Sequence, residues 1–148
     1  MPDSIPADVR HFFTRCAGGR LYYDRDHPTP QFGCVLALSE QPVTQQLPCE
    51  GAAFDQFYTV AEFDEGNYDC VVVSAHSDTY GHIFRLSYSL GDPSLTIADA
   101  HFLAPTFTRW LEIHVEAWDI YSDDWREGLK HFGRLIEHER NSKTRAAA

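Results

Sequence analysis

Two histidines and an aspartate lie close together in the middle of the chain, at His76, Asp78 and His82. If a turn joined two strands here, these side chains could supply nitrogen and oxygen ligands for a divalent metal ion. Zinc sites normally combine closer ligand pairs with further ligands from a separate element. We therefore interpret the two histidines as polar residues that flank a hairpin turn, and a metal-dependent enzyme stays as an alternative.

A second group with possible acid–base chemistry runs from Asp24 to His27, where carboxylates adjoin a histidine. A carboxylate beside a histidine can orient the ring for proton transfer. This group precedes Pro28 in a polar segment, where solvated charges are the ordinary expectation. His114 lies in an apolar helical stripe, which is more typical of a core or boundary histidine than of a ligand.

Catalytic and nucleotide-binding motifs are absent from the sequence. No GxSxG or SxxK motif offers a nucleophile, and no GxxxxGK[ST] or GxGxxG pattern offers a phosphate-binding loop. The four cysteines form no CxxC pair, so their spacing excludes a zinc ribbon or a thioredoxin-type motif. We therefore predict a protein that is not an enzyme and that uses no cofactor or metal.

The charge distribution is strongly one-sided. Between Arg25 and Arg85 the sequence contains nine acidic residues and no lysine or arginine, and the whole chain has a net charge of -10. A field of one sign attracts ligands of the opposite sign, so we expect a basic protein partner and no direct binding of nucleic acid. Arg126, Lys130 and Arg134 recur on one helix face, but interspersed glutamates indicate a solvated surface.

Composition and length predict one globular domain. The chain has 148 residues, of which 43% are hydrophobic and 14% aromatic. A chain of this size can bury a real core without disulfides or metal. No apolar segment of membrane-spanning length and no signal peptide is found, so we expect a soluble cytoplasmic protein that does not bind membranes. Cys16 and Cys70 occupy apolar positions and are expected to be buried as small hydrophobic residues.

Periodicity predicts the elements that would position these residues. An N-terminal helix follows Pro6, with Val9, Phe12, Phe13 and Cys16 on one face and Gly18-Gly19 as its stop. Short β-branched and apolar runs separated by turn residues predict a sheet joined by hairpins, hence an antiparallel meander. The expected strands are Arg20 to Tyr23, Cys34 to Leu38, Phe57 to Phe63, Cys70 to Ala75, His82 to Tyr88 and Leu95 to Ala98.

Two helices are expected after the strands. Thr106 can cap the first and Ser122 the second, and each helix has an apolar stripe at helical spacing. After about Arg140 the pattern ends, so residues 141–148 are expected to form a frayed tail behind a single domain of residues 1–140. Helices segregated from strands predict an α+β fold, in which the helices cover one face of the antiparallel sheet.

The ordered set of short motifs resembles the SUKH superfamily, the group related to the yeast cell-wall assembly regulator. Ile5 to Phe13 is similar to its "LP-x-x-y-x-x-fl" opening, and Ala17-Gly18-Gly19 is similar to its Asn-Gly-Gly turn. The acidic turn from Asp64 to Asp69 precedes a hydrophobic strand, as in the family, and the segment from Ile97 to Glu112 is similar to its "ia-x-sF-x-x-fL" motif. The resemblance spans about Ile5 to Glu116. The chain departs from the family in two ways: the helix that usually precedes the first motif is missing or trimmed, and a late helix is added.

Bacterial SUKH proteins are mostly immunity proteins that bind a contact-delivered toxin, often a nuclease or deaminase. The resemblance therefore implies an immunity-type protein that neutralises a basic toxin, while the yeast relative suggests an intracellular regulatory scaffold as the alternative. Carboxylates for such a surface, with tyrosines as aromatic anchors, are expected from the acidic region. The predicted partner-binding residues are Asp55, Tyr58, Glu62, Asp64, Glu65, Tyr68, Asp69, Asp78 and Tyr80.

Overall fold

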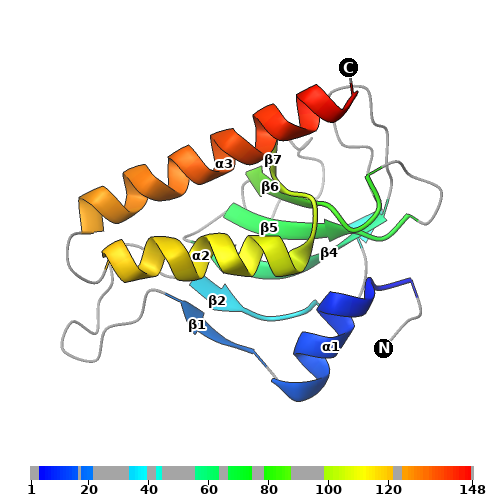
Figure 1. Cartoon of the computed structure of the whole chain (residues 1–148). Helices are drawn as coiled ribbons and strands as arrows, with labels where there is room; N and C mark the ends of the chain where they lie inside the picture. Colours follow the sequence, from blue (N-terminus) through cyan, green and yellow to red (C-terminus); the bar gives the residue numbers. More distant parts are fainter. Residues whose placement is uncertain are drawn as a thin grey trace.

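The computed structural model describes residues 4–16, 18–21, 34–39, 43–44, 56–63, 67–74, 79–87, 99–121 and 125–147. Within these residues it has an α+β fold with three helices and an antiparallel sheet, as predicted (Figure 1). In chain order the elements are α1 (Ala7–Arg15), β1 (Gly19–Leu21), β2 (Cys34–Leu36), β3 (Val43–Thr44), β4 (Gln56–Phe63), β5 (Asn67–Val72), β6 (Ile83–Ser87), β7 (Asp99–Ala104), α2 (Phe107–Tyr121) and α3 (Trp125–Ala147).

The sheet has the strand order β1-β2-β4-β5-β6-β7, and β3 pairs with the first residues of β4. Every pairing is antiparallel, and β4 to β7 follow one another as neighbours, which confirms the predicted meander. The last strand differs from the prediction, because the structure has it at Asp99–Ala104. The predicted strand from Leu95 to Ala98 lies outside the described residues.

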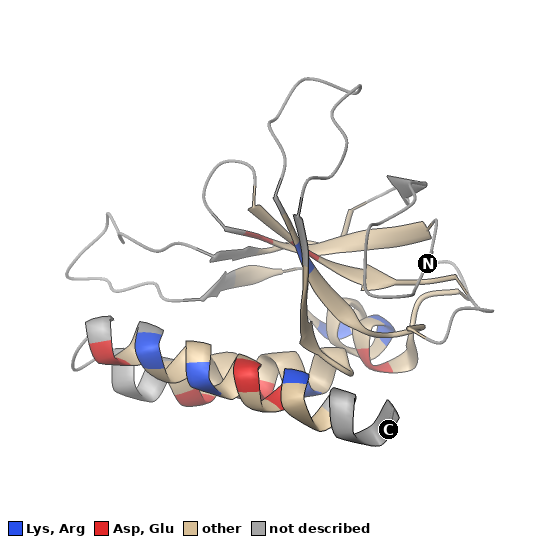
Figure 2. Cartoon of the chain, turned by 90° about the horizontal axis from the view of Figure 1, so that it is seen from above, with Lys and Arg blue, Asp and Glu red and all other residues tan. Residues whose placement is uncertain are grey.

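The two long helices lie on the same side of the sheet, which Figure 2 shows from above. Alternation along the strands directs Val71, Ile83 and Leu103 into a core that also contains residues of all three helices. In α2, Trp110 is fully buried in this core. The predicted arrangement of helices over one sheet face is therefore present.

Side chains of the central strands that point away from the helices are also buried, so β5 is enclosed on both faces. Cys70 is among them, which confirms its predicted role as a small buried residue, and burial raises the pKa of its thiol. Cys16, in contrast, is exposed, because α1 ends at Arg15 and Cys16 has extended backbone angles. The buried residues on this second face include Phe57, Tyr68, Cys70, Val72, Phe84, Leu86 and Phe102.

Two side chains cap the start of α2, one from Thr106 just before the helix and one from α1. The Thr106 hydroxyl accepts a hydrogen bond from the Arg109 amide at 3.0 Å, which confirms the predicted cap. Asp8 of α1 reaches the same turn, and its Oδ2 accepts hydrogen bonds from the Thr108 amide at 3.0 Å and the Thr108 hydroxyl at 3.2 Å. The beginning of the first helix is therefore fixed to the beginning of the second.

The end of α3 corrects the predicted frayed tail, because the helix continues to Ala147. The sequence after Arg140 loses its apolar periodicity but contains no proline or glycine. Lysine, arginine and alanine near the end favour the helix, so backbone hydrogen bonding can continue without a buried face. The predicted cap at Ser122 lies outside the described residues.

Gly18 lies in the connection between α1 and β1 and has a φ of 136°. A Cβ atom at this position would lie 2.4 Å from the carbonyl oxygen of Leu36, on the neighbouring strand. The neighbouring Gly19 is less constrained, since a Cβ there would have no heavy atom within 4 Å. The predicted double-glycine turn therefore depends on its first glycine.

Candidate partner-binding site

The structure places the predicted partner-binding residues in different environments. Tyr58, Glu62, Tyr68, Asp69 and Tyr80 are described by the structure, whereas Asp55, Asp64, Glu65 and Asp78 lie outside the described residues.

Asp69 does not lie on the surface, which corrects its predicted role as a partner-binding carboxylate. The strand register sets it opposite Arg85, and its side chain is 0% exposed. Arg85 Nε donates to Oδ1 at 2.7 Å and Arg85 Nη2 donates to Oδ2 at 3.0 Å. The Trp110 indole N–H donates to Oδ2 at 2.9 Å. Asp69 is thus the centre of a buried network between the sheet and α2. These hydrogen bonds offset the cost of removing its charge from water.

His114 lies beside this network and is a core histidine, as its position in the apolar stripe predicted. Its ring centroid is 4.4 Å from that of Trp110 and 4.8 Å from that of Phe132 in α3. Burial lowers the pKa of His114 well below its usual value, and the positive charge of Arg85 lowers that pKa further. The ring is therefore neutral inside the folded protein at neutral pH.

The lowered pKa of His114 predicts a loss of stability in mild acid. Below the ordinary histidine pKa of about 6.5 the unfolded chain binds a proton here that the folded chain does not, so the free energy of unfolding falls as pH falls, by up to about 1.4 kcal/mol per pH unit. Urea unfolding at pH 7.5 and 5.5 should show a smaller pH effect in His114→Gln than in the wild type. His138→Gln, at an exposed position of α3, is the control and should keep the wild-type pH dependence. Equal pH dependence in all three proteins would contradict the assignment.

Tyr58 is also buried in the core, so it is not available as an aromatic anchor. Tyr80 is 39% exposed, and its hydroxyl donates to the carbonyl oxygen of Ser4 at 3.0 Å. It follows the end of β5, whereas Tyr68 is near the start of that strand. The predicted tyrosines therefore do not form one cluster.

Glu62 and Tyr68 are the predicted residues that the structure brings together. They are opposite each other in the β4–β5 register, and alternation turns them to the face opposite Asp69 and the helices. Both line a hollow of about 260 Å³. Sequence reasoning did not identify the other residues lining this hollow, which are Ala37, Leu38, Ser39 and Thr59.

A β-bulge builds the hollow. The register shifts between Thr59 and Ala61, so that Thr59 is opposite Cys70 and Glu62 is opposite Tyr68. In a regular strand, residues three positions apart point to opposite faces. The extra residue of the bulge brings Thr59 and Glu62 to the same face, as bulges often do beside functional sites.

Local bonding orders the wall of the hollow. The Ser39 amide donates to the Thr59 carbonyl oxygen at 3.0 Å, and the Thr59 amide donates to the Ser39 hydroxyl at 3.1 Å. Burial raises the pKa of Tyr68, and the negative charge of Glu62 raises it further, with a smaller effect from Cys70. The phenol therefore stays neutral beside a carboxylate, which is an arrangement that can bind a cation.

The charge of Glu62 is not compensated within the described part of the chain, where no basic side chain forms an ion pair with it. Arg85, on the nearby strand β6, turns its charge to the other face and pairs with Asp69. The sheet face with the hollow is thus negative at Glu62.

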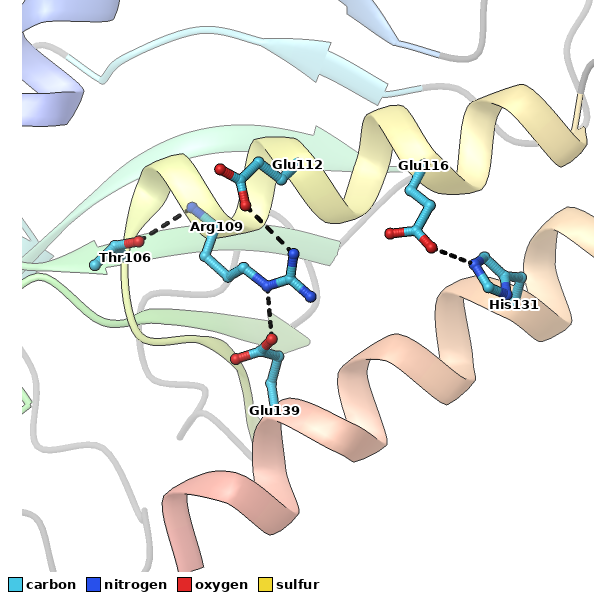
Figure 3. Close-up of polar contacts among 6 residues, drawn as sticks. All are labelled: Thr106, Arg109, Glu112, Glu116, His131 and Glu139. Atoms are coloured by element: carbon cyan, nitrogen blue, oxygen red, sulfur yellow. Dashed lines mark hydrogen bonds and ion pairs between the residues drawn. The ribbon is translucent and has the colours of Figure 1, made fainter. Parts of the chain in front are cut away.

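The long helices, in contrast to this sheet face, have acidic and basic residues interspersed along them (Figure 2). Figure 3 shows Arg109 between Glu112 and Glu139, at 3.3 Å and 2.6 Å, and Glu116 beside His131 at 3.0 Å. On α3, Lys130 pairs with Glu127 at 3.3 Å. Lys130 and Arg134 are both exposed, which agrees with the interpretation of this side of α3 as a solvated helix face.

The metal alternative rests on residues that are mostly outside the described part of the chain, since His76 and Asp78 belong to residues 75–78. His82 is described, and its ring lies against Phe102 at a centroid distance of 5.5 Å. Among the described residues, no three histidine, cysteine or acidic side chains converge as a metal site would require. The group from Asp24 to His27 is also outside the described residues.

None of the helices within the described ranges has the length and apolar character needed to cross a membrane.

Comparisons of the chain with protein-family models, with curated proteins and with solved structures found no match.

Proposed function

We propose that this chain is a non-catalytic, cytoplasmic immunity-type protein with a SUKH-like fold, which binds a basic bacterial toxin and neutralises it by covering its nucleic-acid-binding surface. The observation that carries the proposal is the exposed carboxylate of Glu62, which forms no ion pair with any described residue and lies beside Tyr68 on the side of the sheet away from the helices. An exposed carboxylate in a region without bases attracts a basic partner and can pair with it.

Two further features support this function. The region between Arg25 and Arg85 contains no lysine or arginine, so a basic partner would meet no repelling side chain from that segment. The resemblance to SUKH proteins rests on an ordered set of motifs, and immunity is the usual role of the bacterial members. The charge argument does not depend on the resemblance. It is needed because one fold can host several functions.

An intracellular regulatory scaffold is the second candidate, and the same acidic face could serve it. The two differ in what lies beside the gene. An immunity gene directly follows the gene of its toxin, so expression of the upstream reading frame should be toxic and co-expression of this chain should restore growth. A harmless upstream product would favour the scaffold.

Reversing the charge of Glu62 should weaken binding to the toxin. For Glu62→Lys we expect the dissociation constant to rise about tenfold or more at low salt, because like charges facing each other across an interface repel. The effect should shrink as salt screens the charges. Calorimetric titration at two salt concentrations measures both changes.

Glu137→Lys is the matched control, because it makes the same charge change at an exposed position of α3. It should alter the affinity much less than Glu62→Lys. Equal affinity of the wild type and both variants would remove this sheet face from the interface. Failure of the wild type to bind or to restore growth would contradict the proposed function itself.

A further inference from the structure

The hollow beside Glu62 is small. Its volume of about 260 Å³ is slightly below the range of roughly 300–1,000 Å³ that is typical of small-molecule sites. A metabolite of ordinary size would fill more space and would need more polar contacts than this hollow provides. One long side chain that projects from a protein partner fits it better.

The lining combines apolar and negatively charged surface. Ala37, Leu38 and Thr59 offer methyl and methylene groups, and the ring of Tyr68 is largely covered, with the residue only 8% exposed. Glu62 is exposed and brings its carboxylate to the same hollow. An occupant therefore needs an apolar stem and a cationic end, which is the chemistry of arginine and lysine.

Arginine matches these groups better than lysine. Its planar guanidinium can donate two parallel hydrogen bonds to one carboxylate, and it stacks on aromatic rings. Lysine presents a compact, strongly hydrated ammonium without a planar face. The Glu62 carboxylate and the Tyr68 ring belong to adjacent strands in a fixed register, so these residues need little ordering on binding.

We infer that the hollow lined by Glu62 and Tyr68 is a receptor for one arginine side chain of the protein partner, with the guanidinium on the Glu62 carboxylate and against the Tyr68 ring. This inference rests on the proposed function and adds the chemistry of its central contact. Arginine is enriched among the residues that dominate binding energy in interfaces, and such residues occupy pockets of this kind.

The receptor can be tested without the partner, by NMR titration of the labelled protein with N-acetyl-arginine amide. We expect saturable shifts of the Ser39, Thr59, Glu62 and Tyr68 amide signals, with a dissociation constant in the millimolar range. N-acetyl-citrulline amide has nearly the same shape without the charge and should bind about 10- to 100-fold more weakly, because hydrogen bonds to charged groups are the stronger ones. N-acetyl-lysine amide should lie between the two.

Glu62→Gln should lose the preference for arginine over citrulline, whereas Glu137→Gln should keep it. Both positions are exposed, so neither variant removes a core contact. Equal binding of the arginine and citrulline probes by the wild type, or an unchanged preference in Glu62→Gln, would overturn the inference. A protein that restores growth against its toxin but ignores the arginine probe would overturn the receptor and leave the proposed function intact. Arginine binding without toxin neutralisation would support the receptor and contradict the proposed function.

Discussion

Replacing Asp69 with asparagine is expected to lower the free energy of unfolding by about 3–5 kcal/mol, because it leaves the charge of Arg85 in a mostly buried site without its counter-ion. Arg85 is 20% exposed and makes two of its hydrogen bonds to this one carboxylate. The indole N–H of Trp110 would also lose its charged acceptor. Since small domains are stable by only about 5–15 kcal/mol, urea unfolding should show the change at once.

Glu112→Gln provides the comparison, because Glu112 also pairs with an arginine, at 3.3 Å, but its side chain is 59% exposed. The cost should be below about 1 kcal/mol, as for other exposed pairs. A cost for Asp69→Asn no greater than that for Glu112→Gln would mean that the buried network is not formed. A double variant that replaces both Asp69 and Arg85 with apolar residues should recover part of the loss, since no charge is then left unpaired.

Replacing Gly18 with alanine is expected to cost about 2–5 kcal/mol, which combines backbone strain with overpacking. At a φ of 136° an L-residue is strained, and the added Cβ would lie 2.4 Å from the carbonyl oxygen of Leu36. The connection from α1 would have to shift away from β2 to relieve this contact. Thermal and urea unfolding of the variant should both report the loss.

Gly19→Ala is the matched control, one residue away in the same segment. A Cβ at position 19 meets no heavy atom within 4 Å, so the change should stay within about 0.5 kcal/mol. Similar costs at the two positions would show that the strain is not specific to Gly18.

Much of the architecture could be predicted from local patterns. The cap at Thr106, the helix beginning near Ala7 and the hairpin order of β4 to β6 each follow from residue types within a few positions. The strand at Asp99–Ala104 is not among the predicted strands, and the predicted run from Leu95 to Ala98 lies outside the described residues. The strand ends before Pro105, which cannot donate to a sheet ladder, and a register shift against β6 breaks its alternation near the end, where Phe102, Leu103 and Ala104 are all buried.

The charge of the acidic region was readable from the sequence, but the face on which each acid lies was not. Asp69 stands between Tyr68 and Cys70 in a strand that is buried on both faces. An acid inside such a run must be buried with a partner, and this signal, together with Arg85 as the first following base, could have identified the pair. Glu62 lies on the other face of the sheet, so the prediction of a single patch containing both Asp69 and Glu62 was wrong.

The hollow itself could not be predicted. Strict alternation would place Thr59 and Glu62 on opposite faces, and the bulge that reverses this leaves no mark in residue type. Ser39 joins the same wall through the backbone hydrogen bond from its amide to Thr59 and the bond that its hydroxyl accepts from the Thr59 amide. These contacts depend on the register between distant segments, which one sequence does not specify.

The hydrogen bonds from Thr108 to Asp8 join residues that are 100 positions apart in the chain. During synthesis, α1 emerges from the ribosome long before the turn that it caps, and it has to wait with its apolar face uncovered. Contacts of such long separation slow folding, because the chain loses loop entropy before it gains the contact. The attachment of α1 to α2 is therefore expected to be a late step of folding.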